Sequence, residues 1–219
     1  MLRFWNLLGN LQIQLAGEFL MTNSPLWTRL LGVLVLLTGL HAFAQTTKWQ
    51  IDPAHSDALF SVRHMGISNV HGSFSQVTGT VMYDDKNITG SSVDATIQTN
   101  TVNTDNTMRD NDLKSPKFFD VAKYPTMHFV SSKLTNEGGQ LKLYGNLTMH
   151  GVTKPVVLNM DPLGKQQLDP YGKLRRGFTA STVLNRRDFG LVWNGTLKSG
   201  DSVVGDEVKV TLEVESTKE

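Results

Sequence analysis

The sequence contains no cysteine among its 219 residues, and it carries almost no net charge. Without cysteine the chain can form neither disulfides nor thiolate metal sites, so its fold must depend on a hydrophobic core. Lys and Arg number 21 against 20 Asp and Glu, which gives a formal net charge of +1. The basic excess that draws proteins to nucleic acids or acidic membranes is therefore missing, and we expect no nucleic-acid partner.

Catalytic signatures are missing as well. The sequence has no G-x-S-x-G elbow, no P-loop, no G-x-G-x-x-G and no H-E-x-x-H motif. His55, Ser56 and Asp57 have the residue types of a hydrolase triad, but neighbours on an extended chain point to opposite faces. The sequence therefore assigns no catalytic residue, and a triad would need distant partners that the sequence does not reveal.

A metal site would have to be built from histidines and carboxylates alone. Beyond residue 45 the histidines are His55, His64, His71, His128 and His150. No two of them have the close spacing of a ligand pair, although His64 and His71 flank one turn and could meet. We expect these histidines to lie at strand ends and to bond to the backbone, and we predict no metal ligand and no cofactor.

The sequence also lacks an apolar run of the about 20 residues that a membrane span needs. Its longest run, Leu30–Leu40, follows Arg29 and precedes Ala42-Phe43-Ala44. A basic start, a short apolar run and small residues before a cut are typical of a secretory signal. We therefore interpret residues 1–44 as an export signal cleaved between Ala44 and Gln45, and we expect no stable membrane anchor. Because this signal is complete from Met21 onward, Met21 is an alternative start of translation.

In residues 45–219 apolar residues recur with the two-residue period of β-strands. At the C-terminus Val208, Val210, Leu212 and Val214 alternate with polar residues, which predicts a strand with one face in a core. Turn residues separate such runs at intervals of roughly a dozen residues, as in barrels and sandwiches. The other apolar faces are Ala58/Phe60/Val62, Val93/Ala95/Ile97, Met127/Phe129, Leu141/Leu143/Leu147/Met149, Val156/Leu158/Met160 and Phe178/Ala180/Thr182/Leu184.

One segment, Thr104–Asp120, breaks this alternation. Its capping residues predict a short helix from about Asn106 to Lys114, followed by a turn that Ser115 caps and Pro116 opens. A helical insert that ends in two adjacent phenylalanines can cover one end of a barrel.

The inward-facing apolar side chains have two interpretations. They either pack as an ordinary core or line a cavity, because an eight-stranded barrel is filled by side chains or holds one small ligand. The candidate ligand-binding residues are Phe60, Phe74, Met108, Leu113, Phe118, Phe119, Met127, Phe129, Met149, Phe178 and Phe189.

Two polar clusters lie beside these residues, Arg63-His64 and Asn185–Phe189. An arginine beside an aspartate at a strand end can be an ion pair that fixes a turn, as Arg187 and Asp188 would be. The same groups can instead receive the polar end of a ligand whose tail lies in the barrel. Under that interpretation Arg63, His64, Arg187 and Asp188 form a polar mouth.

The order and spacing of several motifs resemble the YceI-like family, which comprises bacterial periplasmic proteins with a lipocalin-like barrel that bind polyisoprenoids. The resemblance covers residues 48–216. The motifs that carry it are Trp49–Ser56, Phe60–His64, Val70–Phe74, Leu113–Asp120, Tyr124–Phe129, Gly145–Val156 and Asn185–Leu191.

The resemblance implies an all-β fold, an antiparallel lipocalin-like barrel of about eight strands with a short helical insert. It also implies a periplasmic carrier whose partner is an isoprenoid lipid, either a polyprenyl chain or an isoprenoid quinone. A homodimer is one possible assembly. Two alternatives stay open, namely an enzyme that acts on a quinone or lipid, and a partner or stress protein whose barrel is filled.

Overall fold

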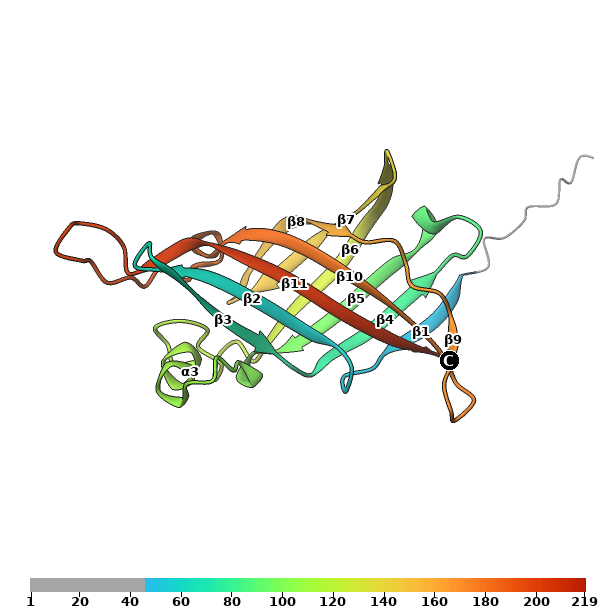
Figure 1. The fold of residues 1–219 in the computed structure, drawn as a ribbon, viewed down its shortest axis with the longest axis horizontal. Helices are drawn as coiled ribbons and strands as arrows, with labels where there is room; N and C mark the ends of the chain where they lie inside the picture. Colours follow the sequence, from blue (N-terminus) through green and yellow to red (C-terminus); the bar gives the residue numbers. More distant parts are fainter. Residues whose placement is uncertain (1–45) are drawn as a thin grey trace, which may run out of the picture. The chain divides into compact units, whose positions relative to one another are not determined.

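The computed structural model describes residues 46–219, which form an antiparallel β-barrel with one short α-helix (Figure 1). The predicted export signal, its cleavage site and the alternative start at Met21 lie outside the described residues. The elements are β1 (Thr47–Ile51), β2 (Asp57–His64), β3 (Ser68–Phe74), β4 (Val77–Tyr83), η1 (Ile88–Gly90), β5 (Ser92–Gln98), η2 (Thr99–Thr101), α3 (Thr107–Lys114), β6 (Thr126–Glu137), β7 (Gln140–Met149), β8 (Val152–Met160), β9 (Gln167–Leu168), β10 (Leu174–Asn185), η3 (Arg186–Phe189) and β11 (Val204–Lys218).

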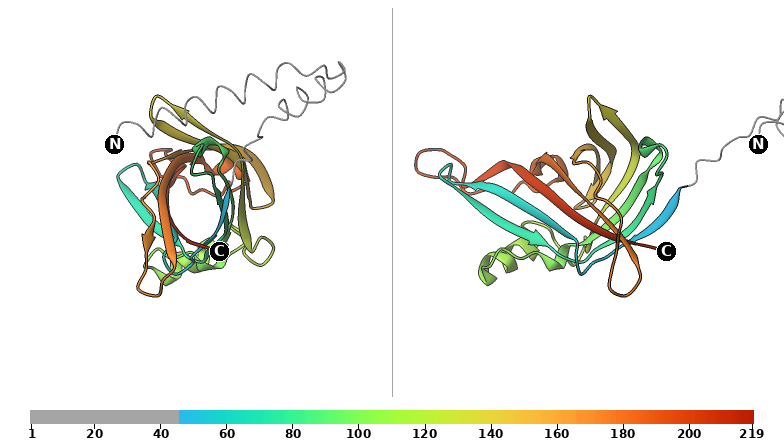
Figure 2. Two further views of the ribbon diagram at one scale, coloured as in Figure 1. Left: turned by 90° about the vertical axis from the view of Figure 1, so that its right-hand side faces the viewer. Right: turned by 45° about the vertical axis from the view of Figure 1, so that its right-hand side comes forward.

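The barrel is a ring of 8 antiparallel strands in the order β1, β4, β5, β6, β7, β8, β10 and β11, and β11 pairs with β1 to close it (Figure 2). β10 and β11 pair over eleven residues each, from Arg175 opposite Thr217 to Asn185 opposite Glu207. This register keeps the apolar faces of both strands on the inside of the barrel. The predicted fold class, an antiparallel barrel of about eight strands with a helical insert, is confirmed.

Two further strands widen one end of the barrel. β11 pairs with β1 near its C-terminal end and with β2 over Val204–Glu213, so that β1 and β2 follow one another along the same neighbour. β3 pairs with β2 and ends the strand order of the sheet. At this free edge Ser73 and Asn103 exchange two backbone hydrogen bonds of 2.9 Å, so the insert between β5 and β6 covers the edge.

The insert contains the predicted helix. The side chain of Asn106 accepts a hydrogen bond from the backbone N–H of Arg109, and α3 begins at the next residue, Thr107. After the helix, the backbone N–H of Phe119 bonds to the carbonyl oxygen of Leu113, which turns the chain back toward the barrel. No helix in the described part of the chain is long and apolar enough to cross a membrane.

The interior contains two hydrophobic clusters. The first lies at the end of the barrel near the C-terminus and is centred on Trp49 and Tyr83, whose rings meet edge to face with centroids 5.4 Å apart. The second lies at the end where α3 packs, and it surrounds a cavity. We call these two parts the filled end and the open end. The filled end comprises Trp49, Ile51, Val77, Val81, Tyr83, Val93, Leu134, Leu141, Leu143, Leu158, Met160, Phe178, Ala180 and Val214.

Candidate functional site: an apolar cavity and its outer groove

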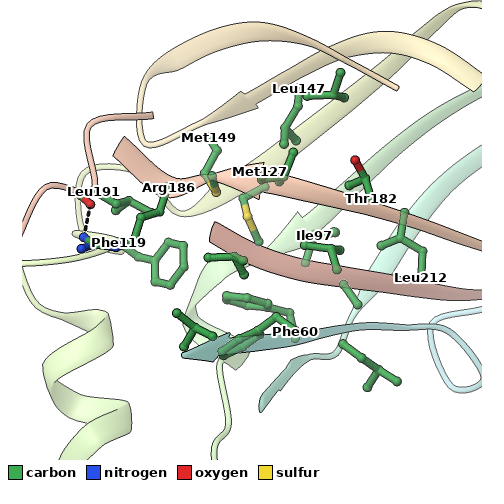
Figure 3. A pocket seen from close by; sticks show the side chains of 18 of the residues that line it. Phe60, Ile97, Phe119, Met127, Leu147, Met149, Thr182, Arg186, Leu191 and Leu212 are labelled. Carbon is green, nitrogen blue, oxygen red and sulfur yellow. Dashed lines mark hydrogen bonds between the residues drawn. The ribbon is translucent and has the colours of Figure 1, made fainter. Parts of the chain in front are cut away.

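The open end encloses a cavity of about 170 Å³ (Figure 3). Strands from all sides of the barrel contribute to its wall, and the insert covers the remaining side. The lining comprises Ala58, Leu59, Phe60, Val62, Phe74, Ile97, Leu113, Phe118, Phe119, Met127, Phe129, Leu147, Met149, Val156, Leu158, Thr182, Leu184, Arg186, Leu191, Val204, Val208, Val210 and Leu212.

Thr182 and Arg186 are the polar residues of this lining, and every other lining side chain is apolar. Strand alternation produces this character, because each strand that borders the cavity turns its aliphatic and aromatic residues inward and its polar residues outward. Such a surface offers a ligand hydrophobic burial and almost no directional bonding.

Aromatic rings lie across glycines on the cavity wall. A Cβ atom at Gly145 would lie 2.4 Å from the ring of Phe129, and one at Gly72 would lie 2.4 Å from the ring of Phe60. Only glycine lets these two rings lie flat against the wall. On the insert side Phe119 meets Phe74 edge to face, with centroids 5.2 Å apart.

Arg186 is buried at the rim of the cavity with 5% of its surface exposed. Its guanidinium donates to the carbonyl oxygens of Leu191, Trp193, Val204 and Gly205 and to the Asp206 carboxylate. Burial lowers the pKa of this guanidinium, and the Asp206 charge opposes the effect. Because its donors bond to the protein itself, Arg186 joins the β10–β11 loop to β11 and fixes the shape of the rim.

A second hollow, which we call the outer groove, adjoins the cavity and measures about 320 Å³. The two share lining residues, and the ring of Phe118 lies in both and contacts Trp193 with centroids 5.0 Å apart. The outer groove is much more polar than the cavity. It is lined by Phe60, Val62, Arg63, His64, Val70, Asn106, Met108, Arg109, Asp112, Leu113, Phe118, Trp193, Val203 and Val204.

The structure brings most of the candidate residues together. Eight of them line the cavity, namely Phe60, Phe74, Leu113, Phe118, Phe119, Met127, Phe129 and Met149. Arg63 and His64, from the predicted polar mouth, line the outer groove. Their contact with a ligand stays a prediction.

Other candidates lie elsewhere. Met108 is 83% exposed and lines the outer groove but not the cavity. Phe178 belongs to the filled end, and Phe189 is buried in the cluster behind the cavity wall. Arg187 forms an ion pair of 2.8 Å with Asp206 and not with its neighbour Asp188, which corrects the ion-pair interpretation, and neither residue lines the cavity or the outer groove.

Sequence reasoning missed Arg186, although the signal was present. Phe178, Ala180, Thr182 and Leu184 alternate on the inner face of β10, and the next residue of that series is Arg186. The prediction of a polar mouth named Arg187 in place of Arg186, because Arg187 is followed directly by Asp188. The strand period, continued by one step, would have placed Arg186 inside.

Among residues 46–219, the histidines do not gather into a site. The register of β2 and β3 sets His64 opposite Ser68 and His71 opposite Ser61, so the two do not form a cross-strand pair. Only His150 shows the expected backbone bond, to the carbonyl of Phe189, whereas His55 and His128 bond to carboxylates, those of Asp52 and Asp94.

One group of potential metal ligands occurs among the described residues, namely Asp52, His55 and Glu215, whose ligand atoms lie within 4.8 Å of one another. Arg175 already bridges its two carboxylates, with Nη1 at 2.6 Å from an oxygen of each. The guanidinium offsets part of their charge, so we interpret the group as an ion-pair cluster that joins β1, β10 and β11.

A closed antiparallel barrel with an apolar cavity at one end defines the class of ligand-binding β-barrels. The comparison with known proteins places the chain within this class. The family model described as the YceI-like domain matches residues 49–216, and the chain belongs to this family. Protein YceI of Salmonella arizonae is 38% identical over 161 residues, which cover 74% of this chain and 83% of that protein. Protein YceI of Salmonella paratyphi B shows the same values.

Solved structures share the barrel. The YCEI protein of Campylobacter jejuni is 30% identical with a TM-score of 0.59, over 72% of this chain and 90% of that one. BcnA of Burkholderia cenocepacia is 23% identical with a TM-score of 0.64, over 75% and 98% of the two chains. A polyisoprenoid binding domain from Saccharophagus degradans is 15% identical with a TM-score of 0.56, over 80% and 100%. At these low identities the last two similarities concern the fold alone.

Proposed function

We propose that the protein is a periplasmic carrier that sequesters a long-chain isoprenoid lipid, either a polyprenyl chain or an isoprenoid quinone, with its tail in the barrel. The observation that carries the proposal is the cavity at the open end, whose lining is apolar except for Thr182 and Arg186. A branched hydrocarbon tail matches this wall because it needs burial and no hydrogen bonds. Each buried methylene contributes ~0.8 kcal/mol, so several isoprene units outweigh the cost of ordering the tail.

The size of the cavity limits how the tail can lie. An apolar cavity of roughly 150 Å³ accommodates benzene in another protein. The cavity of about 170 Å³ therefore has room for one or two isoprene units with the side chains as they stand. A longer tail extends into the outer groove or moves the insert that carries Phe118 and Phe119, since both hollows meet at Phe118.

The charge distribution favours a carrier over an enzyme that acts on the lipid. General acid–base chemistry needs a titratable group within hydrogen-bond reach of the reacting atoms. Among the residues that line the cavity the titratable one is Arg186, and its donors are engaged by backbone carbonyls and Asp206.

One further observation and one prediction from the sequence support the proposal. The Saccharophagus degradans neighbour with the same fold is named for polyisoprenoid binding. The secretory signal expected in residues 1–44 would deliver the chain to the periplasm, where a lipid that passes between membranes needs a protein that shields it from water.

The direct test is native mass spectrometry of the mature protein purified from its own periplasm, followed by organic extraction. We expect an isoprenoid lipid at about one per chain. A protein that carries no lipid and also fails to take up added prenyl quinones would contradict the carrier proposal and favour a filled barrel with a protein partner.

A variant tests the role of the insert. Phe119→Asp places a charge in the apolar lining beside Phe74. We expect this charge to weaken lipid binding more than it weakens folding. The matched control is Val183→Asp, which adds the same charge on the outer face of β10, where the side chain is 56% exposed. If Phe119→Asp and the parent retain equal lipid, the insert does not contribute to binding.

A further inference from the structure

Exposed apolar side chains gather at the open end of the barrel. Of the eleven large apolar side chains that are exposed in the described part of the chain, five belong to three segments at this end. The β2–β3 turn carries Met65 and Ile67, α3 carries Met108, and the β10–β11 loop carries Val192 and Trp193. In Figure 1 these three segments lie at the same end of the molecule. We call the five side chains the apolar tips.

Backbone hydrogen bonds join two of the three segments. The N–H of Met65 donates to the carbonyl oxygen of Val203 at 2.8 Å, and the N–H of Val203 donates to the carbonyl oxygen of Gly195 at 3.0 Å. The β2–β3 turn therefore lies against the β10–β11 loop. Met108 and Trp193 line the same outer groove, so the tip on α3 and the tips on the loop border one opening.

The β2–β3 turn holds its methionine in an unfavourable conformation. The N–H of Ile67 donates to the carbonyl oxygen of His64 at 3.1 Å, and the two residues between them, Met65 and Gly66, have φ angles of 52° and 73°. A hairpin turn with positive φ at both central residues is of type I′, which favours asparagine followed by glycine. A long side chain such as that of methionine is strained at positive φ.

Met65 differs from the other residues that adopt this conformation. Among the described residues the remaining non-glycine positions with positive φ are polar, namely Gln76, Asp105, Asp120 and His150. Next to Met65 the side chain of Ile67 is 76% exposed, and a Cβ atom added at Gly66 would have no neighbour within 4 Å. The turn thus projects into solvent with an apolar residue on each side of its glycine. Strained residues and clustered exposed apolar side chains both indicate an interaction surface.

The three segments have no net charge as a set. Residues 63–71, 104–120 and 190–203 contain five basic and five acidic residues, so their formal charge is 5 − 5 = 0 with histidine neutral. Contact with a partner therefore depends on the burial of apolar surface and not on an excess of one sign. The charged residues are Arg63, Arg109, Lys114, Lys117 and Lys198 against Asp105, Asp110, Asp112, Asp120 and Asp201.

We propose that the apolar tips dock the protein reversibly on the surface of a phospholipid bilayer, with the open end of the barrel toward the membrane. A stable interface with another protein needs a continuous, complementary surface of about 800 Å² on each partner. The bilayer interface instead accepts apolar side chains that project singly from turns, and tryptophan is favoured there. The inference rests on the proposed function for the choice of a lipid surface as the partner, and it goes beyond that function because docking needs no lipid in the cavity.

Tryptophan fluorescence tests docking directly. Residues 45–219 contain two tryptophans, Trp49, which is fully buried in the filled end, and Trp193, which is one of the apolar tips. A change in emission when vesicles are added to the mature protein therefore reports on Trp193. We expect a blue shift with vesicles of phosphatidylcholine alone and quenching by brominated acyl chains. High salt should not weaken the effect, because the three segments carry no net charge.

A double variant separates docking from folding. Met65→Asn/Ile67→Thr removes two apolar tips and gives the turn the Asn-Gly sequence that type I′ favours. We expect partition onto vesicles to weaken at least about tenfold, because apolar burial is lost. The free energy of unfolding should stay equal or rise, whereas a purely structural role of Met65 would lower it. Uptake of a prenyl quinone from detergent solution should match that of the parent, since neither residue lines the cavity.

A matched control removes apolar side chains from another place. Leu168 and Tyr171 are exposed on the β9–β10 hairpin, which lies at the opposite end of the barrel (Figure 1). Leu168→Thr/Tyr171→Asn should therefore keep the partition of the parent. Weaker partition in this control would mean that exposed apolar surface in general, and not the apolar tips, governs contact with vesicles.

Three further results would overturn the inference. The first is a parent whose Trp193 emission does not shift with vesicles, and the second is equal partition of the parent and Met65→Asn/Ile67→Thr. The third is a parent that does not bind vesicles but sediments as a dimer that dissociates in this variant, which would make the tips an interface between two copies. A parent that docks on vesicles but takes up no prenyl quinone would support docking and overturn the proposed function instead.

Discussion

The two ends of the barrel share strands but are packed differently. At the filled end Trp49 is fully buried, Tyr83 and Leu143 are 1% exposed, and a hollow beside Tyr83 measures about 10 Å³. At the open end the same barrel encloses about 170 Å³. β10 and β11 run through both, with Phe178 and Val214 in the first and Leu184 and Val208 in the second.

Residues that stabilise the fold and residues that line the cavity therefore lie at different positions along the same strands. Where strands pair all around the ring, aromatic and aliphatic side chains meet at close contact and fill the interior. Where β3 ends the sheet, the insert covers the side of the cavity that the strands leave open, and space remains. We therefore expect substitutions at the filled end to change mainly the free energy of unfolding and those at the open end to change mainly lipid binding.

The largest difference should come from removing one ring at each end. Trp49→Ala should lower the free energy of unfolding by about 3–5 kcal/mol, because Trp49 is fully buried against Tyr83. Phe129→Ala should cost about 1–3 kcal/mol, since its ring already borders empty space. Denaturant unfolding of both variants measures the difference, and equal losses would contradict a division of the barrel into two ends.

The next largest effect concerns the buried arginine at the open end. Arg186→Gln should cost about 3 kcal/mol, because it removes the guanidinium donors of the Leu191 and Trp193 carbonyls in the β10–β11 loop. Arg187→Gln, its exposed neighbour on the same carboxylate, should cost less than about 1 kcal/mol. Thermal unfolding measured by circular dichroism compares them, and a similar loss for both would show that Arg186 is not the residue that holds the loop.

A matched pair of alanines sharpens the comparison. Ala180→Leu enlarges a fully packed position of the filled end and should cost about 1–3 kcal/mol through overpacking. Ala58→Leu adds the same atoms to the cavity wall, where space exists, and should cost less than about 1 kcal/mol while it reduces lipid uptake. Uptake of a prenyl quinone and urea unfolding are measured on both proteins. A loss of uptake in Ala180→Leu alone would reverse the assignment of the two ends.

The smallest effect depends on pH and concerns the ion-pair cluster of β1, β10 and β11. Burial raises the pKa of Asp52, but hydrogen bonds from Arg175 and His55 outweigh it and hold the pKa at about 2. Because this value lies below the ordinary 3.8, the contribution to stability is present above pH 3.8 and is lost as pH falls toward 2. Asp52→Asn should therefore cost about 1 kcal/mol at pH 7 and almost nothing near pH 2.

Urea unfolding across this pH range checks the prediction. Asp161→Asn, an exposed carboxylate outside the ion pairs of the described residues, is the control and should change stability little at either pH. An equal loss for Asp52→Asn at both ends of the range would mean that Asp52 acts through packing and not through its charge.

Much of the fold could be predicted from local patterns. Alternation on β11, β7 and β8 placed the apolar residues on the correct face, because a strand that is half buried must alternate. The capping side chain of Asn106 marked the start of α3, since a helix end needs a partner for its free N–H groups. Alternation alone could not reveal the bulge between Ser131 and Lys133 in β6. Odd-numbered residues such as Phe129 point inward before the bulge, and the even-numbered Leu134 points inward after it.

The candidate site was predictable as a set of residues but not as an arrangement. Phe178 and Phe129 look alike in the sequence, each an aromatic residue on the inner face of a strand. Their positions along the barrel axis, which depend on the register of every strand between them, place the first in the filled end and the second at the cavity. Arg63 and Arg109 are far apart in the sequence, and only the packing of α3 beside β3 brings them to one groove.

Strand period and helix caps are local properties of the chain, so the residues alone predicted antiparallel strands in a barrel or a sandwich and a helical insert. The choice of a barrel came from the resemblance to the YceI-like family. Tertiary structure alone decided where the barrel is filled and where it is hollow. A cavity is a difference between the volume that the backbone encloses and the volume that the side chains occupy. That difference depends on register, on rings that lie against Gly72 and Gly145, and on how far the insert reaches inward, and none of these quantities is local.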